Sequence, residues 1–390
     1  MSFYKNSQEL SKDFNTIKYI LGLIVIPNLG RKRIFTLLNR FSTFEAIWQA
    51  NKEELKEIKR INIEIINAIL AGPNKKQIET LIEHIKELNA WVVINDGGEF
   101  PELLSSISDP PILIFGQGDY SVLKTPSIAI VGSRNATSYG KKMSFDIAYG
   151  LSEQGVTIVS GLAMGIDTQA HKGAIAAHGK TIAVLGCGLD FNYPKSNTEM
   201  RKCIIENGAI ISEYLPGVRP NPGNFPNRNR LISGLSLGVV VVEASKKSGS
   251  LITASYALEQ GREVFAVPGS VYSYKSYGTH WLIKQGAILV ENAKDVLDNI
   301  SPFHLLDCKS TYKGILDTTK KNKKNFLLEQ IGGLSSDEKR LYEALEPYSQ
   351  HIDDLSNKLN IPVSKVGALL VQLELKDLVI SLPGQMYQLK

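Results

Sequence analysis

Short, continuously apolar segments recur through the middle of the chain, separated by stretches long enough to form helices. Strands that are apolar on both faces are typical of a parallel sheet covered by helices on both sides. The pattern predicts an α/β domain over residues 91–305, with a Rossmann-like, doubly wound and mainly parallel sheet. The predicted strands are Ser127–Val131, Val156–Val159, Thr181–Leu185, Ala209–Ile211, Val239–Val242, Val264–Val267 and Ile288–Val290, with Trp91–Ile94 and Pro110–Gly116 extending the sheet.

Helical spacing dominates both ends of the chain. Residues 1–90 predict a small helical domain, in which the Pro/Gly turn and basic helix start at Ile26–Arg33 resemble a helix-hairpin-helix or SAM-like unit. An αα-hairpin that simply packs is the alternative. A capping box at Ser335–Glu338, three amphipathic helices and a hairpin about Pro383-Gly384 predict a winged helix over 334–390. Residues 306–333 are rich in lysine and are expected to form a linker.

Glycine and serine follow most of the predicted strands. In open α/β sheets ligands bind outside the carboxyl ends of the strands, where such residues let backbone amides approach an anion. The sequence therefore predicts an anion-binding edge, with Arg134 and Lys195 nearby. The segments concerned are Gly132-Ser133-Arg134, Ser160–Asp167 with Gly161, Gly186-Cys187-Gly188, Glu243–Ser250 with Ser248, and Pro268-Gly269-Ser270.

The stretch Pro216–Arg230 contains three arginines, one phenylalanine and no carboxylate. Its prolines favour a stiff loop rather than a helix. Arginine forks beside an aromatic ring suit a phosphate backbone with unstacked bases, although a solvated basic loop is the simpler alternative. We expect Arg219, Arg228 and Arg230 to contact phosphate and Phe225 to meet a base or anchor the loop. Asn229 is expected to brace the loop from within.

Composition permits a nucleic-acid partner without demanding one. The chain has 390 residues, is 43% hydrophobic and carries a net charge of +5. Its three cysteines lack metal-ligand spacing and fit a reducing cytoplasm, and its six histidines are scattered. No apolar run approaches the ~20 residues needed to span a bilayer. We expect a cytoplasmic protein with no metal and no cofactor.

No arrangement of side chains indicates catalysis. Asp167, His171, Glu213 and Glu243 are the candidates, but a Gly-x-Ser-x-Gly elbow and a Ser/His/Asp set are absent. A helix-N-terminal Asp167 with a hydrogen-bonded His171 is the simpler interpretation. Ala174–Thr181 is similar to a phosphate loop, but it precedes a strand instead of following one. The chain is therefore expected not to be an enzyme.

The central region resembles one family closely. Ala129–Arg134, Ser160–Asp167, Leu185–Asp190 and Tyr193-Pro194-Lys195 resemble the DprA/Smf family, and the likeness continues through Phe225–Arg230, Ser248–Ala254 and Val267-Pro268-Gly269. The resemblance covers about residues 100–295. It implies a protein of DNA processing in natural transformation that binds and protects single-stranded DNA and loads the RecA recombinase.

The resemblance also implies positions for the site. Ser133, Arg134, Gly161 and Lys195 match the family's DNA pocket, and Phe225 with Arg228-Asn229-Arg230 matches its adjoining segment; Ser248 is added to these candidates. Many relatives have arginine where this chain has Met164, and Arg219 could supply that contact. The surface over Gly278–Val290, with His280, Ile283 and Leu289, is similar to the one used for homodimerisation and recombinase contact, and is also compatible with the last helix and strand of the sheet.

Two alternatives stay open. Nucleotide phosphoribohydrolases of a related fold share the Pro-Gly turn, but they need a Pro-Gly-Gly-x-Gly-Thr-x-x-Glu run where this chain continues Pro268-Gly269-Ser270. The predicted winged helix has six Lys/Arg and eight Asp/Glu over 335–390, a net charge of 6 − 8 = −2. Because affinity for duplex DNA depends on neutralising phosphates, a protein-contact role is favoured there.

Overall fold

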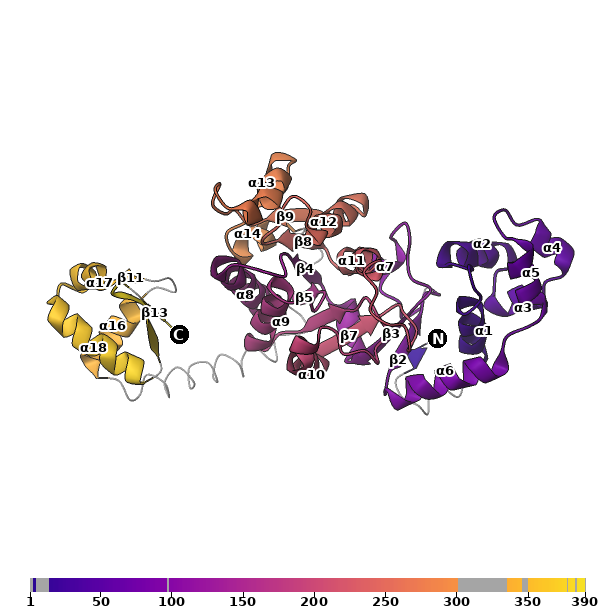
Figure 1. The fold of residues 1–390 in the computed structure, drawn as a ribbon, viewed down its shortest axis with the longest axis horizontal. Helices are drawn as coiled ribbons and strands as arrows, with labels where there is room; N and C mark the ends of the chain where they lie inside the picture. Colours follow the sequence, from indigo (N-terminus) through magenta and orange to yellow (C-terminus); the bar gives the residue numbers. More distant parts are fainter. Residues whose placement is uncertain are drawn as a thin grey trace. The chain divides into compact units, whose positions relative to one another are not determined.

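The chain forms two compact units, residues 1–311 and 312–390. The computed structural model describes residues 3–4, 14–96, 98–300, 335–345, 350–376, 378–382 and 384–389. The predicted linker at 306–333 lies outside the described residues. Figure 1 shows the elements of both units. Within the described part of the chain no helix is long and apolar enough to cross a membrane.

The described strands of the first unit form a ten-stranded sheet in the order β1-β2-β3-β7-β6-β5-β4-β8-β9-β10. The strands from β7 to β10 in this order are parallel, whereas β1, β2 and β3 add an antiparallel edge. From β4 the chain continues to β5, β6 and β7 on one side and later to β8, β9 and β10 on the other side. The boundary between β4 and β8 is therefore a topological switch point. The bounds are Phe3–Tyr4, Trp91–Ile94, Leu113–Gly118, Ser127–Val131, Thr157–Ser160, Thr181–Val184, Gly208–Ser212, Gly238–Val241, Glu263–Ala266 and Ile288–Leu289 for β1 to β10.

Alternate residues of these strands enter different hydrophobic cores, as the two-residue period of a strand requires. In β4, Ala129 and Val131 pack into one core with α11 and α12, while Ile128 and Ile130 pack on the other face with α8 and α9. The doubly wound, mainly parallel sheet is thus confirmed, and the predicted strands match it to within one or two residues at most ends. Pro110–Gly116 is displaced: its strand is β3, Leu113–Gly118.

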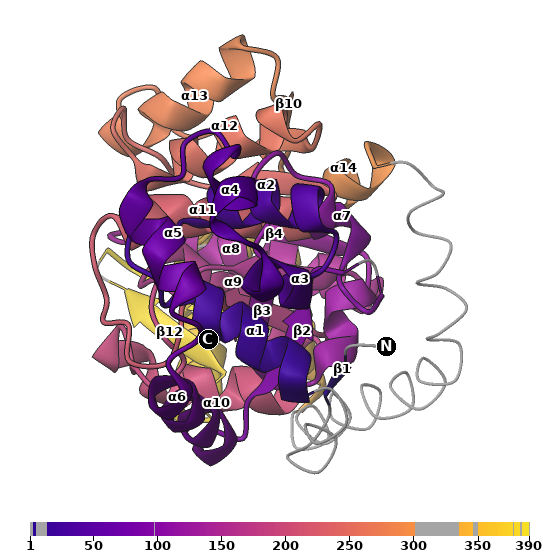
Figure 2. The ribbon, with the colours of Figure 1, turned by 90° about the vertical axis from the view of Figure 1, so that its right-hand side faces the viewer.

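Helices of the first unit cover both faces of the sheet. Figures 1 and 2 place α12 and α13 at the end opposite α10. Helix α9 ends at Ala176, before β6, so Ala174–Thr181 is a helix end leading into a strand and not a phosphate loop. The helices are α7 Glu102–Ser105, α8 Ser138–Glu153, α9 Ile166–Ala176, α10 Thr198–Asn207, α11 Asn224–Leu235, α12 Gly249–Glu259, α13 Tyr277–Lys284 and α14 Ala293–Asp298, with 3-10 turns at Tyr120–Lys124, Lys195–Asn197 and Tyr274–Ser276.

Six N-terminal helices share a core with one end of the sheet, in which Ile34 and Leu37 join Val92 and Phe115. The predicted turn before a basic helix is present, because α2 starts at Arg31 after Gly30. Arg31 pairs with Asp109 and lies 3.6 Å from Glu213, so it contacts the sheet domain. These helices are α1 Phe14–Ile24, α2 Arg31–Phe41, α3 Phe44–Gln49, α4 Lys52–Lys56, α5 Ile63–Leu70 and α6 Lys75–Glu87.

The second unit is a winged helix. Ser335 and Glu338 form the predicted capping box, and the apolar positions of the three helices are buried in one core. The strands pair in the order β11-β13-β12. The elements are α16 Ser336–Ala344, β11 Gln350–His351, α17 Ile352–Leu359, α18 Val363–Leu375, β12 Val379–Leu382 and β13 Met386–Leu389.

The prediction of a loop at Asn224–Arg230 is wrong, because α11 already starts at Asn224. Proline is tolerated in the first helical turn, where the backbone N–H has no partner within the helix. Pro226 lies in that turn. The preceding segment, residues 216–223, keeps the prolines that exclude a helix.

Candidate nucleic-acid interface

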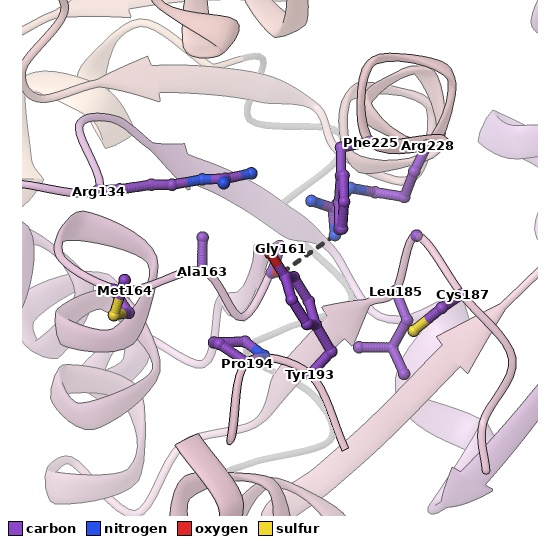
Figure 3. A pocket seen from close by; sticks show the side chains of 11 residues that line it. Arg134, Gly161, Ala163, Met164, Leu185, Cys187, Tyr193, Pro194, Phe225 and Arg228 are labelled. Atoms are coloured by element: carbon purple, nitrogen blue, oxygen red, sulfur yellow. Dashed lines mark hydrogen bonds between the residues drawn. The ribbon is translucent and has the colours of Figure 1, made fainter. Parts of the chain in front are cut away.

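A pocket lies at the carboxyl ends of β4, β5 and β6, and the first turns of α11 close it (Figure 3). It contains about 410 Å³ of empty space, part of it open to solvent. Its walls are partly apolar and partly cationic, as a site for a flat base beside a phosphate requires. The lining residues are Arg134, Gly161, Ala163, Met164, Leu185, Gly186, Cys187, Tyr193, Pro194, Phe225 and Arg228.

The ring of Phe225 is the centre of the pocket. Its centroid lies 5.3 Å from that of Tyr193, with a tilt of 34° between the rings. The guanidinium of Arg134 lies 5.4 Å from the centroid and extends toward the ring in Figure 3. A Cβ on Gly186 would come within 2.8 Å of the ring, so only glycine leaves room for it. Sequence reasoning found Phe225 but missed Tyr193, because tyrosine before a Pro-Lys pair carries no signal of its own.

Arg228 forms the floor of the pocket instead of reaching for phosphate. Its side chain is buried and donates to the carbonyl oxygens of Gly161, at 3.0 Å, and Val184. Burial lowers the pKa of Arg228 to about 10, while Asp167 opposes that shift. The guanidinium therefore stays charged at neutral pH and holds the ends of β5 and β6 together. The structure thus gives Arg228 a bracing role, and its contact with phosphate stays a prediction.

Arg230 lies outside the pocket lining, in an ion-pair network. Its Nη2 is 2.5 Å from Glu213 and its Nε is 3.4 Å from Asp109, and the side chain is 3% exposed. Two carboxylates thus neutralise a guanidinium that solvent does not reach. The contact of Arg230 with phosphate stays a prediction, and in this structure its guanidinium is engaged by Glu213 and Asp109. Asn229 does act as a brace: it accepts from Arg228 Nε and donates to the Gly249 carbonyl at 3.2 Å.

Three other cations remain available at the edge. Arg134, Lys195 and Arg219 are exposed, and none makes a side-chain ion pair within the described part of the chain. Arg134 lines the pocket, and Lys195 follows the lining residue Pro194. Arg219 is on the exposed segment before α11 and does not line the pocket, so the structure does not bring it to the place of Met164, which is a half-exposed lining residue.

The loop after β5 is held from two sides. Asp167 accepts from the amides of Gly161, at 3.1 Å, and Ala163, at 3.3 Å. Asn197, in the 3-10 turn that carries Lys195, donates to the Leu162 carbonyl at 2.9 Å. These bonds fix the positions of Gly161 and Lys195 relative to each other. The bonds to Asp167 are local and fit its predicted place at a helix N-terminus, whereas the bond from Asn197 joins segments 35 residues apart and could not be predicted from the sequence.

Ser133 and Ser248 flank the pocket. Ser133 is partly buried, follows β4, and its carbonyl accepts from the Ile166 amide at 3.2 Å. Ser248 is the N-cap of α12, and its hydroxyl lies 2.7 Å from that of Ser250. The Asn229–Gly249 bond places Ser248 beside α11. Neither serine is part of the pocket lining, and both lie on the same sheet edge.

The side chains of all four candidate catalytic residues make hydrogen bonds or ion pairs within the fold. Besides Asp167 and Glu213, Glu243 accepts from the Thr137 amide at 3.0 Å, and His171 Nδ1 lies 2.7 Å from Thr181 Oγ1. His171 is therefore hydrogen-bonded as expected, although to Thr181 and not to Asp167. Burial lowers the pKa of His171 to about 3, so the ring is neutral. A neutral, buried imidazole without solvent access is a poor general base.

Cys187 is the remaining nucleophile in the pocket wall. Burial raises the pKa of its thiol to about 11. Since the thiolate is the reactive form, this cysteine is inert at neutral pH. Among the described residues no group of three or more His, Cys, Asp or Glu could hold a metal ion.

Comparison with known proteins identifies the family. Residues 91–301 match the family described as DNA recombination-mediator protein A, and residues 329–385 match the DprA winged helix domain. The chain is 34% identical to protein Smf of Synechocystis sp. over 389 residues, which cover 95% of this chain and 98% of that protein.

Two pneumococcal comparisons agree. The DNA processing protein DprA of Streptococcus pneumoniae is 49% identical over 198 residues, 51% of this chain and 70% of that protein. The X-ray structure of DprA from Streptococcus pneumoniae superposes with a TM-score of 0.65 and 36% identity, covering 73% of this chain and 98% of that chain.

Proposed function

The chain belongs to the DNA recombination-mediator protein A (DprA/Smf) family, and from this membership and the pocket geometry we propose that it binds single-stranded DNA at the carboxyl edge of the sheet. The proposal rests on two cations at the pocket that contains the ring of Phe225, Arg134 and Lys195. Neither cation has a carboxylate partner in the described part of the chain. Cations of this kind attract phosphate, and an aromatic ring offers a stacking surface to any base.

The pocket suits an unpaired strand better than a duplex. Its apolar wall, with Leu185, Tyr193 and Pro194, is recessed between strand ends. A base must leave its stack to enter, which costs little in a single strand and several kcal/mol in a duplex. The walls present rings, backbone and cations and few side chains that read base edges, so binding is expected to be nearly independent of sequence and sensitive to salt.

Recombinase loading and strand protection belong to the same proposal. DprA/Smf proteins are the expected mediators between incoming single strands and a RecA-type recombinase, acting in the cytoplasm during transformation. We propose that this chain does the same and that it acts as a homodimer through α13 and β10. Support comes from β10, an edge strand of the described sheet, on which Leu289 is 47% exposed. An unpaired edge with exposed apolar side chains is suited to a partner.

His280 and Ile283 lie beside that edge on α13, and both are partly exposed. His280 Nε2 is 3.1 Å from the Gly269 carbonyl, so its ring is fixed against the turn after β9. Ile283 packs partly against the core shared with α12. These two residues with Leu289 are the proposed dimer and recombinase contact.

An enzyme of the phosphoribohydrolase class is the second candidate. Its support is limited to the Pro268-Gly269 turn, which lacks the glycine, threonine and glutamate that such enzymes require there. The four catalytic candidates are engaged in structural bonds. We propose a binding protein without catalytic activity.

Fluorescence anisotropy with oligothymidine and with duplex DNA of equal length tests the proposal. We expect tight binding of the single strand, weak binding of the duplex, and a steep loss of affinity with salt. Sedimentation of the same samples measures the oligomeric state of the protein. We expect Leu289→Asp to dissociate the dimer. Equal affinity for both DNA forms, or release of free base from nucleoside monophosphates by the purified protein, would refute the proposed function.

A further inference from the structure

A second group of cations and rings lies beyond the pocket, at the carboxyl ends of β8 and β9. It consists of Lys246, Lys247, Tyr274, Lys275 and Tyr277, called here the tyrosine–lysine surface. Tyr274 is 60% exposed and Tyr277 is 43% exposed. Burying tyrosine rings is favourable, so exposed tyrosines grouped together indicate a surface that is covered by a ligand.

The lysines and rings of this surface are already in contact. Lys246 Nζ lies 5.3 Å from the centroid of Tyr277, and Lys275 Nζ lies 5.9 Å from that of Tyr274. Backbone bonds hold the two segments together, since the Ala244 amide donates to the Lys275 carbonyl at 2.8 Å and the Gly278 amide to the Ala244 carbonyl at 2.7 Å. Alternating cations and rings on a fixed backbone form a platform for bases and phosphates.

Acidic residues are absent from the segments that build this surface. The sequence contains no Asp or Glu from 244 to 258 and none from 264 to 290. Glu243, before the first segment, is buried and engaged by Thr137, and Glu263, before the second, is the first residue of β9 and so lies at the other end of that strand. The two segments that build the tyrosine–lysine surface therefore present lysines and no carboxylate to an anion.

The surface is joined to the pocket through the switch point of the sheet. Asn229, one residue after Arg228, donates to the carbonyl of Gly249 at the start of α12. On the other side Lys275 Nζ donates to the carbonyl of Asn135, the residue after Arg134. Strands β4 and β8 are neighbours here although they are far apart in the sequence, and ligands of such sheets lie across this point. Figure 1 shows β8 and β9 beside β4, with α12 and α13 at their ends.

We propose that a single strand held in the pocket continues across the switch point onto the tyrosine–lysine surface, where Tyr274 and Tyr277 stack on its bases and Lys246 and Lys247 contact its phosphates. This inference rests on the proposed function and adds a second binding segment to it. The proposal also defines the path of the DNA, which crosses the carboxyl edge of the sheet from β6 past β4 to β9. A longer DNA is thus bound more tightly than the pocket alone allows.

A second copy of the chain is the rival occupant, and charge argues against it. In a two-fold interface the same patch faces itself. Lys246, Lys247 and Lys275 would then meet the same lysines, with no carboxylate in either segment to offset the repulsion. A polyanion complements this surface. The proposed homodimer contact uses His280, Ile283 and Leu289, and the tyrosine–lysine surface includes only the first residue of α13, Tyr277.

The test compares oligothymidines of about 5 and about 15 nucleotides, lengths that span the range of sites of one single-strand-binding module. Affinities are measured by anisotropy for the full chain, for Tyr274→Ala/Tyr277→Ala and for Tyr274→Phe/Tyr277→Phe. We expect the alanine pair to weaken binding of the longer strand about tenfold or more. The phenylalanine pair keeps both rings and is expected to bind like the wild type. Binding of the short strand, confined to the pocket, stays unchanged and shows that the variant is folded.

The lysines are tested through salt dependence. Lys246→Ala/Lys247→Ala is expected to make the dependence of log affinity on log salt shallower by about 1.4 for the longer strand, about 0.7 for each lost phosphate contact. Lys52→Ala/Lys56→Ala removes the same charge from exposed positions on α4 and serves as the matched control, with an unchanged slope.

The outcomes separate this inference from the function on which it rests. If the wild type binds neither strand, the proposed function fails. If it binds both and the alanine pair binds the longer strand equally well, the second segment is refuted while the pocket stands. If the alanine pair changes the sedimentation of the protein and leaves DNA affinity intact, the surface is a protein interface and the inference is overturned.

Discussion

The pocket edge of the sheet and the winged helix both belong to fold types that bind nucleic acids, yet they treat their cations in opposite ways. At the pocket edge Arg134 and Lys195 are exposed and have no carboxylate partner among the described residues. In the winged helix Lys365 lies 2.6 Å from Asp337, and Lys376 lies 2.7 Å from Glu338. These two lysines are the cations that α18 and its end would offer to a duplex.

The difference teaches that the partners of a cation matter more than the fold that presents it. A lysine that is already paired must break its ion pair before it can neutralise a phosphate. It therefore contributes less to DNA affinity through counterion release. Two apolar side chains of α18 are also exposed, Val371 at 51% and Leu375 at 83%. These differences support the proposals of a protein-contact role for the winged helix and of single-strand binding at the sheet edge.

The largest expected effect is a loss of stability on removing Arg230, a buried arginine of α11. This variant distinguishes a structural role of Arg230 from a role in DNA binding. Arg230→Ala removes the nearer cation from the buried carboxylate of Glu213 and leaves it with Arg31, 3.6 Å away, which is expected to cost about 3 kcal/mol of stability. Thermal unfolding followed by circular dichroism measures this loss. Single-strand affinity, measured below the unfolding transition, is expected to stay near that of the wild type. A stable Arg230→Ala protein that no longer binds DNA would return Arg230 to the binding site.

The next effect tests the contrast between free and paired cations directly. Arg134→Ala/Lys195→Ala is expected to weaken single-strand binding about 100-fold, from about 1.5 kcal/mol for each charged contact. Its stability should be unchanged, since neither side chain has an ion pair with a described residue to lose. Lys365→Ala/Lys376→Ala removes the same charge from the winged helix and is the matched control. Equal losses of affinity in the two double variants, measured by anisotropy, would break the contrast.

A smaller effect sharpens the role of the aromatic ring. Phe225→Leu keeps an apolar side chain near Gly186 but removes the stacking surface and the cation–π contact with Arg134. We expect single-strand affinity to fall by about 1–2 kcal/mol, with an unchanged salt slope. Anisotropy titrations at several salt concentrations measure both quantities. A changed slope with unchanged affinity would show that the ring orders the cations and does not stack on a base.

The smallest effect is a pH dependence confined to the winged helix. The hydrogen bond from Lys376, with help from Ser335, lowers the pKa of Glu338 to about 2, below the ordinary 4.5. Because the pKa is lower in the folded state than in the unfolded state, ionised Glu338 stabilises the winged helix above about pH 4.5. This contribution to stability is lost as the pH falls from 4.5 toward 2. Methyl NMR signals of Leu341 and Leu355 are expected to show this loss. Glu338→Gln should remove most of that dependence; an identical acid transition in the variant would exclude Glu338 as its source.

Much of the fold could be predicted because the relevant signals are local. Strand periodicity placed the sheet, and the Ser335–Glu338 capping box set the start of α16, since both depend on neighbouring residues. The start of α11 was missed because prolines before and within it resemble a loop, although Pro226 lies where a helix tolerates it. Tyr193 and Asn197 were missed for another reason: their roles depend on contacts with Phe225 and Leu162, which lie outside any local pattern.

By itself the sequence determined the order of the elements, the family and the edge at which glycine, serine and arginine gather. Tertiary structure alone decided which arginines are free. Arg134, Arg228 and Arg230 look alike in sequence, but Arg228 meets the carbonyls of Gly161 and Val184, and Arg230 meets Glu213 and Asp109. Whether a cation is available depends on burial and on partners brought from distant segments, and these are properties of the folded chain.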